Sequence, residues 1–399
     1  MRKMIIHPEY LHALDSFMEL SIRKGAFPGC QVFAAVNGNI IYQESFGHYT
    51  YDSSSPPVTD STLFDIASVT KIMATTLSVM KLAELGKIDL DSSLNAYLPE
   101  LVGGTNKQGL KIRDLLLHQA GLVAWIPFYK NTLDSLTGKP RTDLYRQVAE
   151  KDFNIPVAAD LYLRNDYVDT IWKTIINSPL DNLGRYVYSD LDFYFLQKVV
   201  EKVGHQSLAE FVAHQFYKPL GLHHILYDPW RTGRIKDCAP TEKDTYFRYQ
   251  LLQGYVHDQG AAMLGGVAGH AGLFATATDI GTVMQMLLNG GIYHHHRFFE
   301  RTTVLDFTSY RSDLSRRGLG FDKPVKEGKG GPASDYCSKS AFGHQGFTGT
   351  CAWADPESGV VFVLLTNRVY PTADNWLITD MNIRTIAQGY IYRALGYGQ

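Results

Sequence analysis

Apolar residues recur at helical spacing near the start of the chain, and a strand-like pattern follows them. One face of the predicted helix carries Leu11, Leu14, Phe17, Met18 and Ile22. Gly25 occupies the usual stop position after its last turn. Apolar runs at 31–36 and 40–46 flank an Asn-Gly-Asn turn, which is a strong signal for a β-hairpin. The first part of the chain is therefore predicted to form a helix followed by two paired strands.

The middle of the chain has mostly helical periodicity, and strand patterns return only near its end. Helices are predicted at 72–85, 112–118, 191–203 and 208–216, separated by long polar and aromatic loops. Apolar runs at 351–354 and 360–366 flank Asp-Pro-Glu-Ser-Gly and predict a second hairpin. A closing helix is predicted from about 376 to 395.

This order of elements predicts an α+β fold with one antiparallel sheet assembled from both ends of the chain. Residues 1–66 and 268–399 would form the sheet domain with its N- and C-terminal helices, and residues 67–267 a mostly helical lobe inserted into it. A cleft between two such lobes is the natural place for a binding site.

Composition is that of an ordinary soluble enzyme and excludes several function classes. The 399 residues are 45% hydrophobic and 20% charged, and 38 basic against 40 acidic residues leave a formal charge of −2. Such a balance suggests neither nucleic acid nor an anionic membrane surface as a partner. No apolar run of about eighteen residues suggests a membrane span. The four cysteines are widely spaced, so we expect buried free thiols rather than a metal site.

The N-terminus starts directly on a predicted helix and shows no apolar leader with a cleavage site. We therefore expect either a cytosolic protein or a chain from which a leader or a preceding domain has been trimmed.

Ser68 and Lys71 form the most informative pattern in the chain, Ser-x-x-Lys, at the start of an apolar helix. Side chains three residues apart share a helix face, so the amine can reach the hydroxyl. A serine hydroxyl needs such a base to become a nucleophile. A neutral lysine near pH 7 requires a pKa about three units below its reference of roughly 10.4. We therefore expect a lowered pKa for Lys71 and activity that climbs towards mildly alkaline pH.

Because Ser-x-x-Lys patterns also arise by chance, Ser68 needs partners elsewhere in the chain. A second copy, Ser21 with Lys24, lies in the last turn of the first predicted helix and is interpreted as solvated. Tyr188, in Tyr-Ser-Asp before a predicted helix, is a candidate general base whose pKa a nearby ammonium could lower. The alternative is a helix-capping motif with a core tyrosine, and Tyr129 and Tyr167 have similar neighbours.

A glycine-rich strand that begins at His344 supplies the third element. Small residues in His-Gln-Gly-Phe would let a substrate backbone approach, and the backbone N–H of Phe347 could join that of Ser68 in an oxyanion hole. The alternative is a glycine-rich strand with a surface histidine. Neither the histidine run 294–296 nor any other cluster has metal-ligand spacing, so no metal and no cofactor is expected. His118 is expected to pack at the foot of the site.

In the order Ser-x-x-Lys, Tyr-x-Asp, His-x-Gly, the chain resembles the class C β-lactamase and D-alanyl-D-alanine carboxypeptidase group of penicillin-recognising serine hydrolases. The resemblance covers nearly the whole chain, including the segments 115–122 and 269–276. It looks closest to serine hydrolase modules that are joined to β-N-acetylglucosaminidase-like domains. It implies a β-lactamase/transpeptidase-like fold in which Ser68 is acylated, Lys71 takes or relays its proton and Tyr188 assists. Ser68 and Phe347 would form the oxyanion hole.

The resemblance also implies that the substrate is bound by Asp190, His344, Gln345, Gly346 and Arg368. Two of these residues depart from the usual pattern of the family. Asp190 stands where an asparagine usually binds the substrate amide, and Gln345 where a threonine often helps to hold a carboxylate. His344 stands at a position that is often lysine. Arg368 could restore a cation for the carboxylate, although a surface arginine is the alternative.

These residues predict a serine acyl hydrolase acting through an acyl-enzyme on D-alanyl peptides of the cell wall or on β-lactams. One alternative is an esterase or amidase acting on small acyl substrates. Another is a noncatalytic wall-binding module attached to a glycosidase. A trimmed leader would place the protein in the periplasm or cell envelope. The expected partners are therefore a small-molecule or peptide substrate and, in a longer protein, an attached glycosidase domain.

Overall fold

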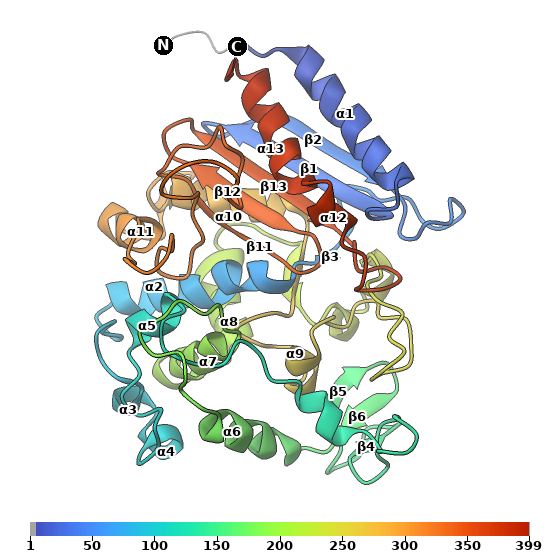
Figure 1. Ribbon diagram of the computed structural model, residues 1–399, viewed down its shortest axis with the longest axis vertical. Coiled ribbons are helices and arrows are strands. Elements are labelled where there is room, and N and C mark those ends of the chain that lie inside the picture. The colour runs from blue at the N-terminus through green and yellow to red at the C-terminus, as the bar shows by residue number, and fades with distance from the viewer. Residues whose placement is uncertain (1–4, 399) are drawn as a thin grey trace.

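A computed structural model describes residues 5–398 and shows a five-stranded antiparallel sheet built from both ends of the chain (Figure 1). Its strand order is β11-β12-β13-β1-β2. The strands are β1 (Gly29–Val36), β2 (Asn39–Gly47), β11 (Phe342–Gln345), β12 (Cys351–Asp355) and β13 (Val360–Thr366). Both predicted hairpins are confirmed, and β1 joins them by pairing with β13.

Helices cover both faces of this sheet. On one face, α1 (Pro8–Arg23) lies beside α13 (Ile383–Ala394) (Figure 1). On the other, α10 (Ala277–Leu288) packs against β1, β12 and β13. Because both faces are covered, every residue of β1, β12 and β13 is buried. Asn37 and Gly38, both at positive φ, form the tight turn of the first hairpin.

The inserted part of the chain is mostly helical. Ser68 lies in a short 3₁₀ turn, Ala67–Val69, which leads through a π-helical turn, Lys71–Thr75, into α2 (Thr76–Glu84). The other helices are α3 (Leu94–Tyr97), α4 (Pro99–Val102), α5 (Ile112–Leu116), α6 (Tyr167–Asn177), α7 (Leu191–Gly204), α8 (Leu208–Val212), α9 (Gln259–Met263), α11 (Arg301–Thr308) and α12 (Leu377–Asp380). None of the helices within residues 5–398 has both the length and the apolar character needed to cross a membrane.

Three small sheets accompany the main one. They contain β3 (Phe64–Asp65), β8 (Leu273–Ala275) and β7 (Ile225–Tyr227); β4 (Tyr145–Arg146), β6 (Leu161–Leu163) and β5 (Ile155–Ala158); and β9 (Ile292–Tyr293) with β10 (His296–Arg297). The β3–β8 pair brings together the two points at which the chain leaves and re-enters the sheet domain. The division at 66/67 and 267/268 stays a prediction, while the α+β architecture is confirmed by the sheet and helices.

Two predicted helices differ in extent from the structure. The closing helix is two helices, α12 and α13, because Asn382 adopts φ 51° between them. The helix predicted at 112–118 ends at Leu116, since His118 adopts φ 56°. Left-handed backbone at a non-glycine residue breaks a helix without leaving a clear mark in the pattern of apolar residues.

Candidate active site

A buried carboxylate shapes the backbone that presents Ser68. Asp65, at the end of β3, accepts hydrogen bonds from the backbone N–H of Ala67 at 2.8 Å and of His257 at 2.7 Å. Ala67 has φ 45°, an unfavourable conformation for a residue with a side chain. The Asp65 carboxylate therefore stabilises the 3₁₀ turn that presents Ser68 to the cleft. It also connects this turn to the segment containing His257 by a hydrogen bond.

Ser68, Lys71 and Asp190 form a continuous chain of hydrogen bonds. Lys71 Nζ donates to Ser68 Oγ at 2.9 Å, to Asp190 Oδ1 at 2.6 Å and to the carbonyl of His270 at 3.3 Å. The lysine side chain is fully buried, while Asp190 keeps 20% of its side chain exposed. All three protons of the ammonium are thus engaged, and one of them points at the serine oxygen.

Lys71 is more basic than the sequence analysis expected. Burial lowers its pKa, but the charges of Asp190 and Tyr188 and the hydrogen bonds with both more than offset burial, so the pKa of Lys71 is raised. The expectation of a lowered pKa is therefore wrong for the free protein. The residue that changes the result is Asp190, a carboxylate where an asparagine would leave the ammonium without a counter-charge.

Tyr188 completes the cluster from the loop before α7. Its ring centroid lies 4.9 Å from Lys71 Nζ, and its hydroxyl interacts with both Lys71 and Ser68. Burial raises the pKa of Tyr188, although Lys71 opposes this shift, so the expected lowering is also wrong. The ring of His118 lies 4.5 Å from that of Tyr188, which confirms its predicted place at the foot of the site.

His118 itself is a buried, uncharged support. Burial and the cations around it hold its pKa well below the usual range. Its Nδ1 lies 2.7 Å from a carboxylate oxygen of Asp192 and accepts the backbone N–H of Ser189 at 3.2 Å. These contacts fix the loop that carries Tyr188.

The loop after β11 approaches the Ser68 turn closely. Thr348 donates its hydroxyl to the carbonyl of Asp65 at 2.7 Å, and Thr350 donates to that of Ile66 at 3.2 Å. A Cβ on Gly346 would lie 2.6 Å from the Ile66 carbonyl oxygen, so only glycine fits there. Within the described residues, the backbone N–H groups of Ser68 and Phe347 have no hydrogen-bond acceptor. Both amides are free to bind a substrate oxygen.

His344 and Gln345 occupy the cleft wall with their polar groups partly engaged. His344 Nδ1 lies 2.7 Å from the Gln345 carbonyl, so a neutral ring donates there. Its buried Nε2 then has no partner in the described part of the chain. Burial, Arg317 and Lys71 lower the pKa of His344 to about 3. The side-chain amide of Gln345 donates to the Pro332 carbonyl at 2.7 Å. Neither residue supplies a positive charge.

Arg317, which the sequence analysis missed, is a buried cation of the cleft wall beside Arg316. It is buried, its Cζ lies 5.3 Å from the ring centroid of Tyr188, and its Nη1 has no partner among the described residues. Burial opposes its charge, but Asp322 and Tyr186 more than offset burial, so its pKa is raised. Its loop has no helical or strand periodicity, so no sequence signal pointed to it. Arg384, also missed, donates to the Gly346 carbonyl at 3.4 Å.

The structure excludes the surface alternative for Arg368, while its role as a cation for a substrate carboxylate stays a prediction. Arg368 is 1% exposed. Its guanidinium donates to the carbonyls of Phe347 at 2.7 Å, Ala373 at 2.9 Å and Asn375 at 2.6 Å. Three backbone acceptors hold this side chain in place through Nε and Nη1, while its buried Nη2 has no partner among the described residues.

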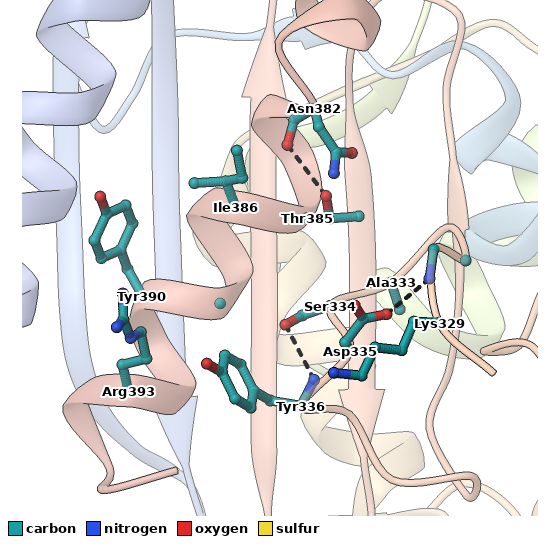
Figure 2. Close-up of a pocket in the computed structure, with 13 residues that line it drawn as sticks. Lys329, Ala333, Ser334, Asp335, Tyr336, Asn382, Thr385, Ile386, Tyr390 and Arg393 are labelled. Atoms are coloured by element: carbon teal, nitrogen blue, oxygen red, sulfur yellow. Dashed lines mark hydrogen bonds between the residues drawn. The ribbon is translucent and has the colours of Figure 1, made fainter. Parts of the chain in front are cut away.

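One cleft of about 1090 Å³ is lined by many of these groups, while Lys71 and His118 lie behind its wall. Its walls include Ser68, Tyr188, Asp190, His257, Asp258, His270, Arg316, Arg317, His344, Gln345, Gly346, Phe347, Arg368 and Trp376. A second pocket, of about 480 Å³, lies between α13 and the segment 329–336 (Figure 2). It is lined by Tyr336, Tyr390 and Arg393 and includes none of the Ser68 cluster.

The alternatives that resembled the site in sequence lie elsewhere or play other parts. Ser21 is buried and donates to the Phe17 carbonyl at 2.8 Å, so the solvated interpretation fails for its side chain. The histidines at 294–296 lie at the β9–β10 turn. The four cysteines are free, and three of them are buried.

Comparisons with known proteins agree with this geometry. The model of the family described as Beta-lactamase matches residues 12–380. A protein of Bacillus subtilis named N-acetylmuramyl-L-alanine amidase is 31% identical over 385 residues, which cover 90% of this chain and 81% of that protein. A protein of Salmonella agona named as a D-alanyl-D-alanine carboxypeptidase is 30% identical over 392 residues, which cover 92% and 84%. A penicillin-binding protein homologue from Caulobacter crescentus has a similar fold, with a TM-score of 0.69, 19% identity and 98% coverage of both chains.

Proposed function

Because this chain belongs to the beta-lactamase family and is a serine hydrolase, we propose that it cleaves acyl substrates through an acyl-enzyme on Ser68. The observation that carries the proposal is the hydrogen bond of 2.9 Å between Lys71 Nζ and Ser68 Oγ, with Tyr188 in contact with both. The favoured substrates are D-alanyl peptides of the cell wall, and β-lactams would act as substrates or slow acylating inhibitors.

Acylation begins when Ser68 Oγ attacks the substrate carbonyl. A proton leaves the hydroxyl, and the carbonyl oxygen gains a negative charge that the N–H groups of Ser68 and Phe347 can bind. Collapse of the tetrahedral intermediate breaks the bond to the leaving amine, which takes up a proton through Lys71 or Tyr188. Water then attacks the acyl-enzyme, releases the acid and returns the proton to Ser68.

The Lys71–Asp190 pair supplies the proton acceptor for the first step. Transfer of one proton from the ammonium to the carboxylate, over the 2.6 Å hydrogen bond, leaves a neutral amine beside Ser68 Oγ. The pair stays electrically neutral during this transfer. Exclusion of water by a bound substrate favours the uncharged form, because an ion pair loses more solvation than two neutral groups. Lys71 can then accept the serine proton.

Arg317 provides the charge that would hold a substrate carboxylate. His344 is uncharged, and Arg368 is bound to three backbone carbonyls. Arg317 has a buried Nη1 near Tyr188 that finds no hydrogen-bond partner within residues 5–398. Arg317 is paired with Asp322, but the buried Nη1 donors lack an acceptor in that described range, so a carboxylate that reaches them gains from both charge and hydrogen bonding. A peptide with a free carboxylate next to its scissile bond fits this arrangement.

Labelling with a fluorescent penicillin and an activated ester, followed by mass spectrometry, tests the proposal. We expect one adduct, located on Ser68. Ser68→Ala should abolish it. Ser21→Ala is the matched control, since Ser21 belongs to the second Ser-x-x-Lys pattern, and it should keep the label. Absence of an adduct with both reagents, or an adduct that survives Ser68→Ala, would overturn the acyl-enzyme.

A second candidate is an amidase or esterase that does not recognise a D-alanyl end. It is favoured because Asp190 is bound to Lys71 and the amide of Gln345 to Pro332, so both groups are turned to the protein. One form of it is cleavage between a muramyl lactyl group and L-alanine, the reaction named for the Bacillus subtilis relative. Turnover of p-nitrophenyl acetate, nitrocefin, a D-Ala-D-Ala peptide and a muramyl peptide separates these possibilities.

The remaining proposals concern the context of the protein. The cleft would lie between the sheet domain, residues 1–66 and 268–399, and the lobe at 67–267. A cell-wall substrate would place the reaction in the envelope, with a glycosidase attached in a longer protein. A noncatalytic wall-binding module is the remaining alternative, and it would be supported if Ser68→Ala left the biological output unchanged.

A further inference from the structure

Two large aromatic side chains stand exposed on the cleft beside the proposed oxyanion hole. Phe347 is 43% exposed and Trp376 is 50% exposed, and both line the cleft that contains Ser68. Their ring centroids lie 5.7 Å apart at an interplanar angle of 84°. We call this pair, Phe347 and Trp376, the aromatic shelf. Aromatic surface that is held in a cleft and exposed to water is typical of a binding site.

Arg368 holds the shelf in a fixed position. Its Cζ lies 4.4 Å from the ring centroid of Phe347 and 4.3 Å from that of Trp376. The backbone carbonyls of Phe347, Ala373 and Asn375 fix the guanidinium itself. The ring of His257 also stacks on that of Phe347, with centroids 5.7 Å apart and an interplanar angle of 19°. The two aromatic side chains therefore lose little freedom when a ligand packs on them.

The surroundings of the shelf are polar rather than apolar. Thr372, Asp374 and Thr379 line the same cleft on the side of Trp376, and Glu242 and Lys243 line it nearby. Hydroxyl, carboxylate and ammonium groups around an aromatic face suit a ligand that has both C–H faces and hydroxyl groups. A long acyl chain would remove water from the exposed Lys243 and Asp374 without offering them a partner, which is unfavourable. A pyranose ring satisfies both kinds of surface.

We infer that the aromatic shelf binds a sugar ring of the substrate, namely the muramyl residue to which a cell-wall peptide is attached. This inference rests on the proposed function in its second form, cleavage of the amide between a muramyl lactyl group and L-alanine. It adds that the substrate is a glycopeptide rather than a free peptide. Because Phe347 carries one proposed oxyanion donor on its backbone and the shelf on its side chain, the sugar would lie close to the reacting carbonyl. That placement favours bonds near the sugar, as in the muramyl amide named above.

Binding measured on the acylation-deficient Ser68→Ala protein tests the shelf separately from catalysis. The probes are N-acetylmuramyl-L-alanyl-D-isoglutamine and the same dipeptide without the sugar, titrated by calorimetry. We expect the glycopeptide to bind about tenfold more tightly, the size of one good aromatic contact. Trp376→Ala in that background should reduce the ratio of the two affinities to about one, and Trp376→Phe should keep part of it.

Trp230→Ala is the matched control, because Trp230 stacks on Tyr255 and is not part of the cleft wall. It should leave the ratio unchanged. Equal affinity of the two probes for the parent protein would overturn the shelf, as would a ratio that Trp376→Ala and Trp376→Phe leave intact. Failure of the proposed function would give a different result, namely no adduct on Ser68, whatever the ratio of affinities for the two probes. Thermal unfolding of each variant checks that the fold is kept.

Discussion

The carboxylate of Asp190 lies 2.6 Å from the ammonium of Lys71, in a site where the lysine side chain is fully buried. An asparagine at this position would offer the same oxygen as an acceptor but no negative charge. The acid therefore stabilises the charged lysine and raises its pKa. In the proposed mechanism, the carboxylate also accepts a proton from Lys71. Stabilisation of the charged lysine and acceptance of its proton both depend on the Asp190 carboxylate. The two roles predict different pH profiles of hydrolysis when the negative charge is removed.

The first prediction concerns Asp190→Asn and the pH dependence of hydrolysis. If Asp190 acts only as a counter-charge, its removal lowers the pKa of Lys71, and the rise of kcat/KM with pH moves to lower pH. If Asp190 also accepts the proton, as we propose, kcat falls at every pH, although the rise of kcat/KM with pH still moves to lower pH. The measurement is a pH profile of ester hydrolysis from pH 5 to 10. Both roles would be contradicted if Asp190→Asn had the same pH profile and the same kcat as the parent protein.

The second prediction concerns Tyr188→Phe. Loss of the hydroxyl removes a proton-transfer group that contacts both Ser68 and Lys71, so kcat should fall about 10²- to 10⁴-fold. The ring would still pack on His118, so the variant should fold as the parent does. Tyr162→Phe, in the small β4-β6-β5 sheet, is the control and should keep its rate. Steady-state kinetics would contradict the role of Tyr188 if the two variants behaved alike.

The sequence predicted the parts of the site that depend on local geometry. Ser68 and Lys71 meet because a helical turn brings residues three apart onto one face. The two β-hairpins follow from turn residues and apolar runs. The strand expected from His344 onward is β11, which ends at Gln345, so Phe347 lies in the loop that follows it. Tyr188 was found through a short motif before a helix. This signal is weaker, because Tyr129 and Tyr167 have similar neighbours in sequence and only the contacts with Ser68 and Lys71 distinguish Tyr188.

What the sequence could not predict depends on contacts between distant residues. The pKa of Lys71 was expected to fall, because burial is visible in an apolar helix, whereas the position of Asp190 119 residues away is not. Arg317 lies in a loop without periodicity, and only the fold brings it to Tyr188. Nothing in the sequence shows that three backbone carbonyls converge on the guanidinium of Arg368 and bury it. The small sheet at 145–163 was missed because its strands are two to four residues long.

The third prediction concerns Arg317→Gln and the recognition of a carboxylate. Removal of the buried cation should raise KM about tenfold or more for a peptide with a free C-terminal carboxylate, the effect of losing one charged hydrogen bond. The same peptide with an amidated end should be affected much less. The ratio of kcat/KM for the two peptides is the measurement. An equal effect on both would show that Arg317 supports the loop through Asp322 and Tyr186 instead.

The same variant carries an electrostatic consequence. Arg317 contributes to the lowered pKa of His344, so Arg317→Gln should raise that pKa from its value of about 3. Proton NMR of the histidine ring would follow this change. Burial alone should still keep His344 uncharged near neutral pH, because burial is the larger cause.

The last prediction concerns Gly346→Ala. A Cβ at this position would lie 2.6 Å from the carbonyl oxygen of Ile66 and 3.4 Å from the Cβ of Ala67. The first distance is far inside van der Waals contact with backbone, so either the β11 loop or the Ser68 turn must move. A shift of the loop carries the N–H of Phe347 away from the oxyanion position, and loss of one such donor costs about 10²- to 10³-fold in kcat.

Gly109→Ala is the matched control for Gly346→Ala, since a Cβ on Gly109 meets nothing within 4 Å. It should keep both its rate and its melting temperature. For Gly346→Ala we expect slow acylation by the activated ester, measured as the rate of adduct formation, with KM changed less than kcat. Normal acylation by this variant would show that Phe347 does not donate to the oxyanion, and a second donor besides Ser68 would have to be sought elsewhere in the cleft.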